Sequence, residues 1–409
     1  MQHQELIPHL FRTEYRKIIS VLCRTFGIEH IELAEDIVSD TFLLAAETWG
    51  QKGLPANPAA WLYTVSKNKA KDIFRHNRVF SDKIIRELKQ AGAVPEPEID
   101  LSESNIQDSQ LQMMFAVCHP GIPPEAQIGL ALNILCGFGT EEIADAFLIT
   151  KEAVYKRLAR AKEKLREERI AIAVPHASEI AGRMDGVLTT LYLLFSEGYY
   201  STSQNATLRK DLCLEAMRLN LMLVEHELTN TPPANALLSL MCFHASRFEA
   251  RTGQKGEIVL YEQQDESLWN RELIEKGIHY LNKASTGTKL SKFHIEAAIA
   301  YWHTQKDDTH EKWERILQLY NRLLQVEYSP MAALNRTYAL ARANGVDEAI
   351  AEAEKLQLRD NHLYHMLLAT LQAEKSAEKQ LFHLQQALHL AKTAPEKNMI
   401  AGRIAALRP

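Results

Sequence analysis

The segment GTEEIADAFLITKEAVYKRLARAKEKLR, residues 139–166, carries apolar side chains at every third or fourth position. That spacing places them on one face of a helix. Ile143 and Phe147 lie on this face in the first part of the segment, and Val154 and Leu158 lie on it in the second part. The segment therefore predicts two amphipathic helices joined by a short break.

Threonines mark the start of both predicted helices. Thr140 is expected to cap the first helix and Thr150 the second, which runs from Lys151 to about Arg166. A helix, a three-residue turn and a second helix form the helix-turn-helix pattern, in which the second helix enters the major groove of DNA. A solvated basic face on a bundle helix is the alternative. The predicted DNA contacts, to base edges in the first half of the helix and to phosphates beyond it, are Thr150, Lys151, Tyr155, Lys156, Arg157, Arg160 and Lys164.

The same helical spacing continues along nearly all of the 409 residues, and alternating β-branched runs are almost absent. The chain is therefore predicted to be all-α. A small helical domain is expected at 1–91 and a second, with the helix-turn-helix, at 110–170. Between them, 92–109 is polar and acidic without a basic residue, as in a linker. A large helical region follows at 171–409, repeat-like from about residue 290.

Composition excludes several classes of protein. The formal net charge of −5 argues against indiscriminate coating of nucleic acid, so any DNA contact must be local. The five scattered cysteines predict reduced thiols in a cytoplasmic protein, with Cys118-His119 more typical of a core cysteine than of half a metal site. No secretion leader and no membrane-spanning run is found. Without a phosphate loop or a nucleophile motif, we expect no enzymatic activity, no cofactor and no metal.

The last part of the chain contains a weak internal sequence repeat. Residues 333–356 and 367–390 each read as a helix, a short polar turn and a helix, about 34 residues apart. With small residues at Ala339, Ala349 and Ala387, this pattern resembles tetratricopeptide-like helical pairs. Unrelated amphipathic hairpins in a bundle are the alternative.

Longer motifs resemble one family. CHPGIPPEAQIGLALNILCGFGTEEIADAFLITKEAVYKRLARAKEKLR (118–166) is similar to region 4 of extracytoplasmic-function (ECF) sigma factors, the promoter-specificity subunits of bacterial RNA polymerase. LAEDIVSDTFLLAAETW (33–49) resembles their region 2 helix that docks on the polymerase, and NPAAWLYTVSKNKAKDIFRHNR (57–78) resembles the helix that opens and reads the −10 element. LYLLFSEGYYS (191–201) and the region after it resemble the members with a long helical, tetratricopeptide-like C-terminal extension.

The resemblance implies binding to promoter DNA and to core RNA polymerase, at the clamp of the largest subunit and at the flap region. It also implies contact between the extension and the sigma domains. Two departures are visible. Ser39 and Asp40 stand where the clamp-binding pattern usually has a glutamine and a glutamate, and Tyr155 stands where an arginine is common, which leaves the −35 sequence open.

The resemblance implies two further sets of site residues, one for the −10 element and one for the polymerase. Reading the −10 element requires base-edge partners beside a basic track for phosphates, expected in Asn68, Lys67, Lys71, Asp72, Arg75 and Arg78. Trp61 and Leu62 are expected to pack the core instead. Polymerase docking is expected at the acidic pair Asp36 and Asp40, flanked by Ile37 and Phe42 as apolar contacts.

Two stretches of the extension, SEGYYS (196–201) and EQQDESLW (262–269), concentrate aromatic, acidic and hydroxyl groups and do not scan as simple amphipathic helices. They are candidates for contacts with the sigma regions or with a ligand. A competing hypothesis is a helix-turn-helix regulator with a helical-repeat domain that senses a peptide or a ligand. A scaffold that binds protein partners through helical repeats is a third.

Overall fold

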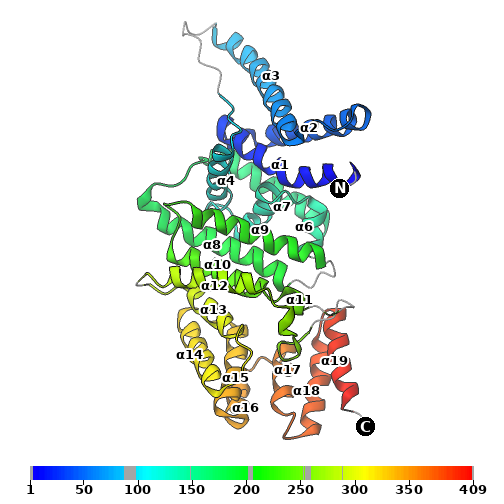
Figure 1. The fold of residues 1–409 in the computed structure, drawn as a ribbon, viewed down its shortest axis with the longest axis vertical. Coiled ribbons are helices and arrows are strands. Elements are labelled where there is room, and N and C mark those ends of the chain that lie inside the picture. The colour runs from blue at the N-terminus through cyan, green and yellow to red at the C-terminus, as the bar shows by residue number, and fades with distance from the viewer. Residues whose placement is uncertain are drawn as a thin grey trace. The chain divides into compact units, whose positions relative to one another are not determined.

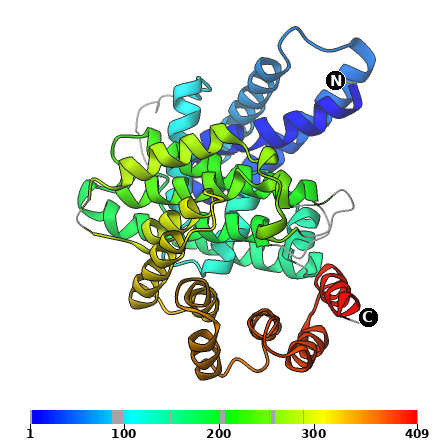
Figure 2. The same ribbon diagram turned by 60° about the horizontal axis from the view of Figure 1, so that its bottom comes forward.

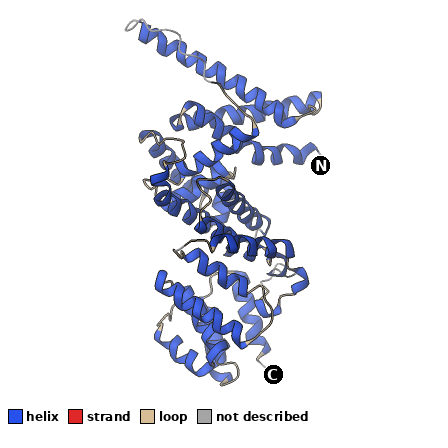
Figure 3. Cartoon of the chain, turned by 60° about the vertical axis from the view of Figure 1, so that its left-hand side comes forward, coloured by secondary structure: helices blue, strands red, loops and turns tan. Residues whose placement is uncertain are grey.

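The computed structural model describes residues 3–86, 98–147, 149–200, 206–251, 253, 259–287 and 289–407. All regular elements in these ranges are helices, as Figure 3 shows. The all-α prediction is therefore confirmed. None of these helices combines the length and the apolar character needed to cross a bilayer. The chain divides into two compact units, unit 1 (Met1–Thr229) and unit 2 (Asn230–Pro409).

Unit 1 contains the helices α1 to α9 and two short helical turns, η1 and η2. Their bounds are α1 His3–Phe26, η1 Ile28–His30, α2 Ile31–Lys52, α3 Pro58–Arg86, α4 Glu103–Val117, α5 Pro124–Leu130, η2 Ala131–Leu135, α6 Thr140–Phe147, α7 Lys151–Glu167, α8 Ala177–Tyr200 and α9 Ala206–Glu225. The predicted break after α6 includes Leu148, which lies outside the described residues.

Helices α1, α2 and α3, drawn in blue in Figure 1, form the first helical group of unit 1 together with α4. Their contacting faces bury Ile18, Val38 and Leu62 completely. Between α2 and α3 the buried hydroxyl of Ser66 donates to Thr41, with 3.2 Å between the two oxygens. Removing these apolar faces from water is the main force that holds the group together.

The fourth helix begins earlier than the sequence analysis predicts. The linker is expected over 92–109, but the last part of that range is helical and belongs to α4, while 92–97 lie outside the described residues. The Asp100 carboxylate accepts the backbone N–H of Ser102 at 2.9 Å and orders the turn that leads into the helix. Ile106, which is 1% exposed, then packs into the core. Ile99, just before the helix, is also buried, so two isoleucines hold this polar stretch against the core.

Helices α5, α6 and α7 and the π-helical turn η2 form the second helical group. The apolar face of α7 packs against α5 and α6. Thr150 caps α7 as predicted, because its hydroxyl accepts the N–H of Ala153 at 3.2 Å. Thr140 is not the cap of α6, since the helix begins at that residue. The Glu142 carboxylate instead accepts the N–H of the preceding Gly139 at 2.9 Å, which stabilises the same end.

Helices α8 and α9 pack against each other and against α4 and α6. Unit 1, which ends at Thr229, therefore includes two helices that the sequence analysis assigns to the C-terminal extension. The functional boundary at residue 171 stays a prediction.

Unit 2 contains α10 to α19 and the short turns η3 and η4. Their bounds are α10 Pro232–Ala245, α11 Phe248–Arg251, η3 Tyr261–Gln263, η4 Glu266–Leu268, α12 Arg271–Ala284, α13 Lys292–Trp302, α14 His310–Val326, α15 Pro330–Asn344, α16 Val346–Lys355, α17 His362–Leu371, α18 Ala377–Leu390 and α19 Ala394–Ala406.

From α12 onward each helix of unit 2 packs on the next one, and the later part of this series is seen in Figure 2. The earlier helix α10 contacts both α12 and α13. At Gly277 the backbone of α12 lies so close to α10 that an added Cβ would be 2.5 Å from the ring of Phe243. The hydroxyl of Ser239 uses this approach and donates to the Gly277 carbonyl at 2.7 Å.

The two segments of the predicted internal repeat form helical pairs, α15 with α16 and α17 with α18. The small residues Ala339, Ala349 and Ala387 are all fully buried. Small side chains allow close helix contacts in either kind of helical array, so kinship with tetratricopeptide repeats stays a prediction.

Candidate nucleic-acid interface

Helix α7 separates an apolar face from a basic one. Val154, Leu158, Ala161 and Leu165 are at most 5% exposed and face the core of unit 1. On the opposite side Tyr155 is 67% exposed, and Lys151, Lys156 and Arg160 are also exposed. Five of the seven residues predicted for the −35 contact, Thr150 included, are thus exposed, whereas Arg157 and Lys164 are half-buried.

Several basic groups on α7 are paired with carboxylates at the surface. Lys151 lies 2.5 Å from Glu141, and this pair raises the pKa of the lysine. Arg157 is half-buried and lies 3.2 Å from Glu125. Solvent-exposed ion pairs contribute little to stability, so a phosphate can replace the carboxylate at small cost. Lys164 is held in the same way, 3.7 Å from Glu168.

Helix α3 carries the residues predicted for the −10 element. Asn68 and Asp72 are exposed and lie one turn apart, with Lys67 and Lys71 half-exposed beside them. Arg75 continues this face and lies 4.0 Å from Asp72. The side chain of Arg78, the last predicted member, lies outside the described residues.

The aromatic residue of this segment packs inward. Leu62 is completely buried, and half-buried Trp61 makes an edge-to-face contact with Trp49 of α2, with ring centroids 5.4 Å apart. Asn57 caps the helix, since its side-chain oxygen accepts the N–H of Ala60 at 3.0 Å. The polar face of α3 is therefore fixed by the core packing of its other side.

The acidic surface of α2 differs in part from the prediction. Asp36 and Asp40 are exposed, but Ile37 and Phe42 are only 1% and 4% exposed. The expectation that these two make apolar contacts with a partner is corrected, because their positions on the helix face the core. Phe42, for example, packs edge-on against the ring of Phe11 in α1, at 5.0 Å.

The apolar side chains that α2 does expose are Leu43, at 60%, and Leu44, at 37%. Sequence reasoning missed them. Leu43 follows Asp36 by seven residues, two helical turns, and therefore lies on the same face as the acidic pair. That spacing was the available signal.

Helix α7 also contacts the first helical group. It packs on η1, and Lys162 makes a 2.5 Å ion pair with Glu35 of α2. The two side chains are only 13% and 17% exposed, and burial raises the pKa of Glu35 although Lys162 opposes that shift. At a more exposed position Arg166 lies 3.4 Å from Glu32. The predicted recognition helix is thus held beside the predicted polymerase-binding helix.

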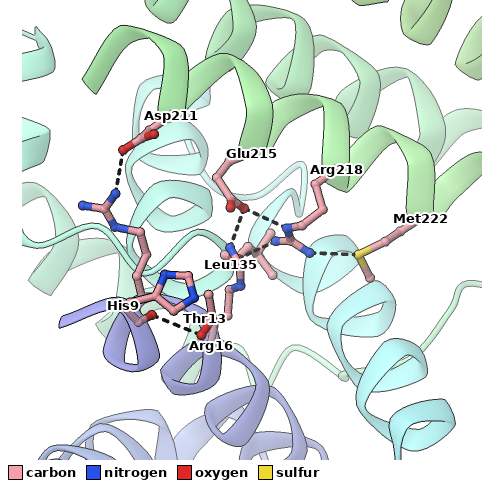
Figure 4. Close-up of polar contacts among 9 residues, drawn as sticks. His9, Thr13, Arg16, Leu135, Asp211, Glu215, Arg218 and Met222 are labelled. Carbon is pink, nitrogen blue, oxygen red and sulfur yellow. Dashed lines mark hydrogen bonds and ion pairs between the residues drawn. The ribbon is translucent and has the colours of Figure 1, made fainter. Parts of the chain in front are cut away.

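Helix α9 ties the two groups together through charged side chains (Figure 4). Arg16 of α1 lies 2.5 Å from Glu215, and Arg218 lies 2.8 Å from the same carboxylate. Arg218 also donates to the Leu135 carbonyl at the end of η2, at 2.9 Å. Burial raises the pKa of Glu215, but the two guanidinium groups outweigh it and hold that pKa below its ordinary value.

A second arginine of α1 makes the same connection near the surface. Arg12 lies 2.6 Å from Asp211 of α9 and 2.7 Å from Glu142 of α6. Its backbone leaves no room for a side chain at Gly137, where φ is +74° and an added Cβ would be 2.9 Å from the Arg12 carbonyl. Helices α1, α6 and α9 therefore meet at one junction.

Helix α8 supports the arrangement from the other side. Arg183 donates to the Phe115 carbonyl in the last turn of α4, at 2.6 Å, and the buried hydroxyl of Thr190 donates to Gln127 of α5, at 2.9 Å. Sequence reasoning predicted contact between the extension and the sigma-like regions but none of these residues, because each pair is far apart in the chain.

The Cys118-His119 pair has ordinary structural surroundings. Cys118 is 2% exposed, and burial raises the pKa of its thiol to about 12. A ring nitrogen of His119 accepts the N–H of Gly121 at 3.1 Å. Searching the described parts of the chain finds no group of three or more potential metal ligands.

Comparison with known proteins assigns part of this geometry. A family model for sigma-70 region 2 matches residues 10–79, which cover most of α1, all of α2 and much of α3. A second model, a family of unknown function (DUF6596), matches residues 183–285 and includes α8 and α9. Residues 10–79 are therefore similar to sigma-70 region 2.

An uncharacterized protein of Rhizobium meliloti, R00370, is 31% identical over 353 residues, which cover 83% of this chain and 81% of that protein. The chain belongs to the same family as this protein. Over its N-terminal part it is also similar to two RNA polymerase sigma factors. CnrH of Cupriavidus metallidurans is 26% identical over 151 residues (35% of this chain, 75% of CnrH), and CarQ of Myxococcus xanthus is 26% identical over 166 residues (40% and 89%). No solved structure matches the chain.

Proposed function

We propose that this protein is an RNA polymerase sigma factor of the extracytoplasmic-function type. It binds core RNA polymerase and directs initiation at promoters whose −10 and −35 elements it recognises. The observation that carries this proposal is the match of residues 10–79 to sigma-70 region 2, on which the polar face of α3 is exposed. Its role is in recognition, without catalysis of its own.

Each surface takes one part of this role. The face of α3 around Asn68 and Asp72 takes the bases of the opened −10 element, with Lys67, Lys71 and Arg75 along the phosphates. The basic face of α7 enters the major groove at the −35 element. Asp36, Asp40 and Leu43 of α2 dock on the polymerase clamp, with a charged rim around an apolar contact.

The described conformation is a closed form in this proposal. Elements centred about 10 and about 35 base pairs upstream are about 85 Å apart on B-DNA, at about 3.4 Å per base pair. Helix α7 lies against α2 through the Lys162–Glu35 pair at 2.5 Å, so the two DNA-reading helices cannot reach both elements together. Initiation then requires α7 to leave α2, and the contacts of α9 with α1 and η2 oppose that movement.

Run-off transcription with purified core RNA polymerase tests the main proposal. We expect promoter-dependent transcripts from the full chain, and a large loss when Lys156 and Arg160 are both replaced by alanine. Arg315→Ala, on an exposed face of unit 2, is the matched control and keeps activity. Absence of transcripts across a promoter library would contradict the proposal. Tight binding to palindromic duplex DNA without polymerase would instead favour a helix-turn-helix regulator.

The closed form has a separate test. Lys162→Ala removes the ion pair with Glu35 but leaves the exposed DNA-facing residues of α7 unchanged. We expect more transcript per bound polymerase than with the unaltered chain. Lys276→Ala, which removes an exposed pair in unit 2, is the control. An unchanged or lower yield would show that this contact does not restrain initiation.

A further inference from the structure

A group of basic and aromatic side chains gathers in unit 2, and none of its residues belongs to the surfaces of unit 1 discussed above. The segment that holds η3 and η4 supplies Tyr261 and Trp269. Arg247 precedes it, and Lys306 and Lys312 come from the end of the turn before α14 and from its first turn. We call these five residues the cationic-aromatic cluster. Trp269 is the last residue of the EQQDESLW stretch (262–269), which did not scan as an amphipathic helix.

The three cations converge on two neighbouring rings. The Arg247 guanidinium carbon lies 5.5 Å and the Lys312 ammonium 5.3 Å from the centre of the Tyr261 ring. Tyr261 stacks on Trp269 at 6.3 Å, and the Lys306 ammonium lies 5.9 Å from the Trp269 ring. Three positive groups therefore lie around one aromatic pair.

These positive charges are not balanced by nearby ion pairs. Arg247 is 7% exposed and Lys312 is 2% exposed. The recorded hydrogen bonds of the two lysines go to uncharged oxygens, those of Gln264, Gln305 and Tyr261. Within the described part of unit 2, no carboxylate makes an ion pair with Arg247, Lys306 or Lys312.

Two nearby carboxylates are committed to other groups, and Asp265 acts on Lys306 only electrostatically, without an ion pair among the described residues. Asp308 pairs with Arg342 and accepts the indole N–H of Trp313, and Glu262 accepts the hydroxyl of Tyr338. Both Asp307 and Asp308 act on Lys312 only at longer range, and burial still lowers the pKa of that lysine. Buried charge without a counter-charge is unfavourable, so this arrangement is stable only at a cost.

Unsatisfied polar atoms lie at the same place. Arg247 Nε, the side-chain oxygen of Gln264 and the indole nitrogen of Trp269 are buried and have no hydrogen-bond partner among the described residues, and the three residues are at most 7% exposed. Two of these three atoms are donors. Buried donors without partners, beside cations that make no direct ion pair in the described structure, indicate a missing acceptor that is itself negative.

We propose that the cationic-aromatic cluster binds a small molecule that carries a phosphate or carboxylate group. The anionic group is held by Arg247, Lys312 and Lys306, and it accepts the free N–H groups of Arg247 and Trp269. Half-exposed Tyr261 and Lys306 form the accessible edge of the site. A nucleic-acid backbone does not fit, because contacts to its phosphates use exposed cations and two of the three cations here are buried. The proposal rests on unit 2 alone and does not depend on the sigma-factor role.

The test uses the full chain and three probes: inorganic phosphate, pyrophosphate and citrate, each titrated at constant ionic strength against chloride. Trp269 and Trp313 lie in or beside the cluster, so we expect a saturable change in tryptophan fluorescence and a rise in melting temperature with at least one probe. The phosphate and citrate arms distinguish a phosphate ligand from a carboxylate ligand. Failure of all three probes to give a saturable response overturns the proposal.

Substitutions within the cluster test whether the fluorescence and melting-temperature responses come from this site. Lys312→Met and Lys306→Met are each expected to weaken binding by about tenfold or more, because each removes a charge-assisted contact. Arg315→Met, on the same helix as Lys312 but with a side chain that is 64% exposed, is the matched control and leaves the titration unchanged. If Lys312→Met does not fold, Lys306→Met alone decides, since Lys306 is only half-buried. An unaltered affinity in the folded variants contradicts the proposed site.

Discussion

Both units bury basic side chains, but they balance the charges differently. In unit 1, Arg16 and Arg218 share the carboxylate of Glu215, at 2.5 and 2.8 Å. In unit 2, Arg247 and Lys312 are similarly buried, yet their recorded partners are rings and uncharged oxygens. A charge that is paired within the chain holds the fold together, whereas a charge that is left unpaired is available to something outside the chain.

The largest expected effect is on the paired side. Glu215→Gln leaves the Arg16 and Arg218 guanidinium groups close together without a carboxylate, and Arg16 is only 6% exposed. We expect unit 1 to lose about 3–5 kcal/mol of its free energy of unfolding, the usual cost of breaking a buried pair from one side. Urea unfolding of the full chain, followed by circular dichroism, measures the loss.

Two comparisons sharpen that result. Glu272→Gln removes a carboxylate from an exposed pair with Lys276 and should leave the unfolding curve unchanged. Replacing the whole group, with Arg16→Met, Glu215→Leu and Arg218→Met together, is expected to cost much less than Glu215→Gln alone, because no charge is left unpaired. If Glu215→Gln alone lowers the free energy of unfolding no more than the triple replacement does, Glu215 does not balance the two arginines.

A smaller effect is expected from pH, and it separates the units. Burial, with Arg247 and Lys312 nearby, lowers the pKa of His303 in unit 2 from 6.5 to about 3. Between these two values the unfolded chain binds a proton at His303 and the folded chain does not, so acid favours unfolding. The contribution of neutral His303 to stability is therefore complete above pH 6.5 and is lost as pH falls toward 3. His303→Gln should flatten the loss of unit 2 stability between these values. For Glu215 the pKa is lowered from 4.5, so its contribution is lost only below that pH.

Urea unfolding at a series of pH values, with the unaltered chain and both variants, measures this difference. Glu215→Gln serves as the control for the upper part of the range, where it should not change the slope. If His303→Gln leaves the slope between pH 6.5 and 4.5 unaltered, the histidine is not buried in its neutral form.

The smallest effect on stability is expected at a third kind of cation, the exposed one. Lys156→Ala on α7 removes a side chain that is exposed and makes no recorded ion pair in the described structure, so the melting temperature should stay within experimental error. Promoter binding by the holoenzyme should weaken, with the slope of log affinity against log salt reduced by about 1, as for loss of one phosphate contact. Fluorescence anisotropy at several salt concentrations measures it. A salt slope equal to that of the unaltered chain would remove Lys156 from the DNA contact.

Much of the local structure could be predicted from the sequence. The apolar spacing predicted an all-α chain, and the pair α6 and α7 is found with Thr150 as the cap of the second helix. The exposed basic face of α7 followed from the same spacing, since residues opposite an apolar stripe face water. The first cap was misread because the helix begins at Thr140, one residue earlier than a cap there would allow.

The acidic surface of α2 shows where such reasoning reaches its limit. Asp36 and Asp40 are exposed as predicted, but the neighbouring Ile37 and Phe42 are buried and Leu43 is exposed in their place. The helix has apolar residues on more than one face, and only the positions of α1 and α3 decide which of them are covered. Similarly, the acidic composition before α4 gave no sign that Ile106 would be buried and extend that helix.

The sequence by itself determined the all-α character, the start of α7 at Thr150 and the sidedness of α3 and α7, because these depend on hydrogen bonds and side-chain spacing within a few turns. Only the tertiary structure decided that Arg16 meets Glu215, 199 residues further along the chain, and that Arg247, Lys306 and Lys312 surround one aromatic pair without an ion pair to any described carboxylate. Whether a buried charge is balanced depends on which helices pack together. Which helices pack together is set by the fit of their apolar faces, and the sequence alone does not show which two faces fit.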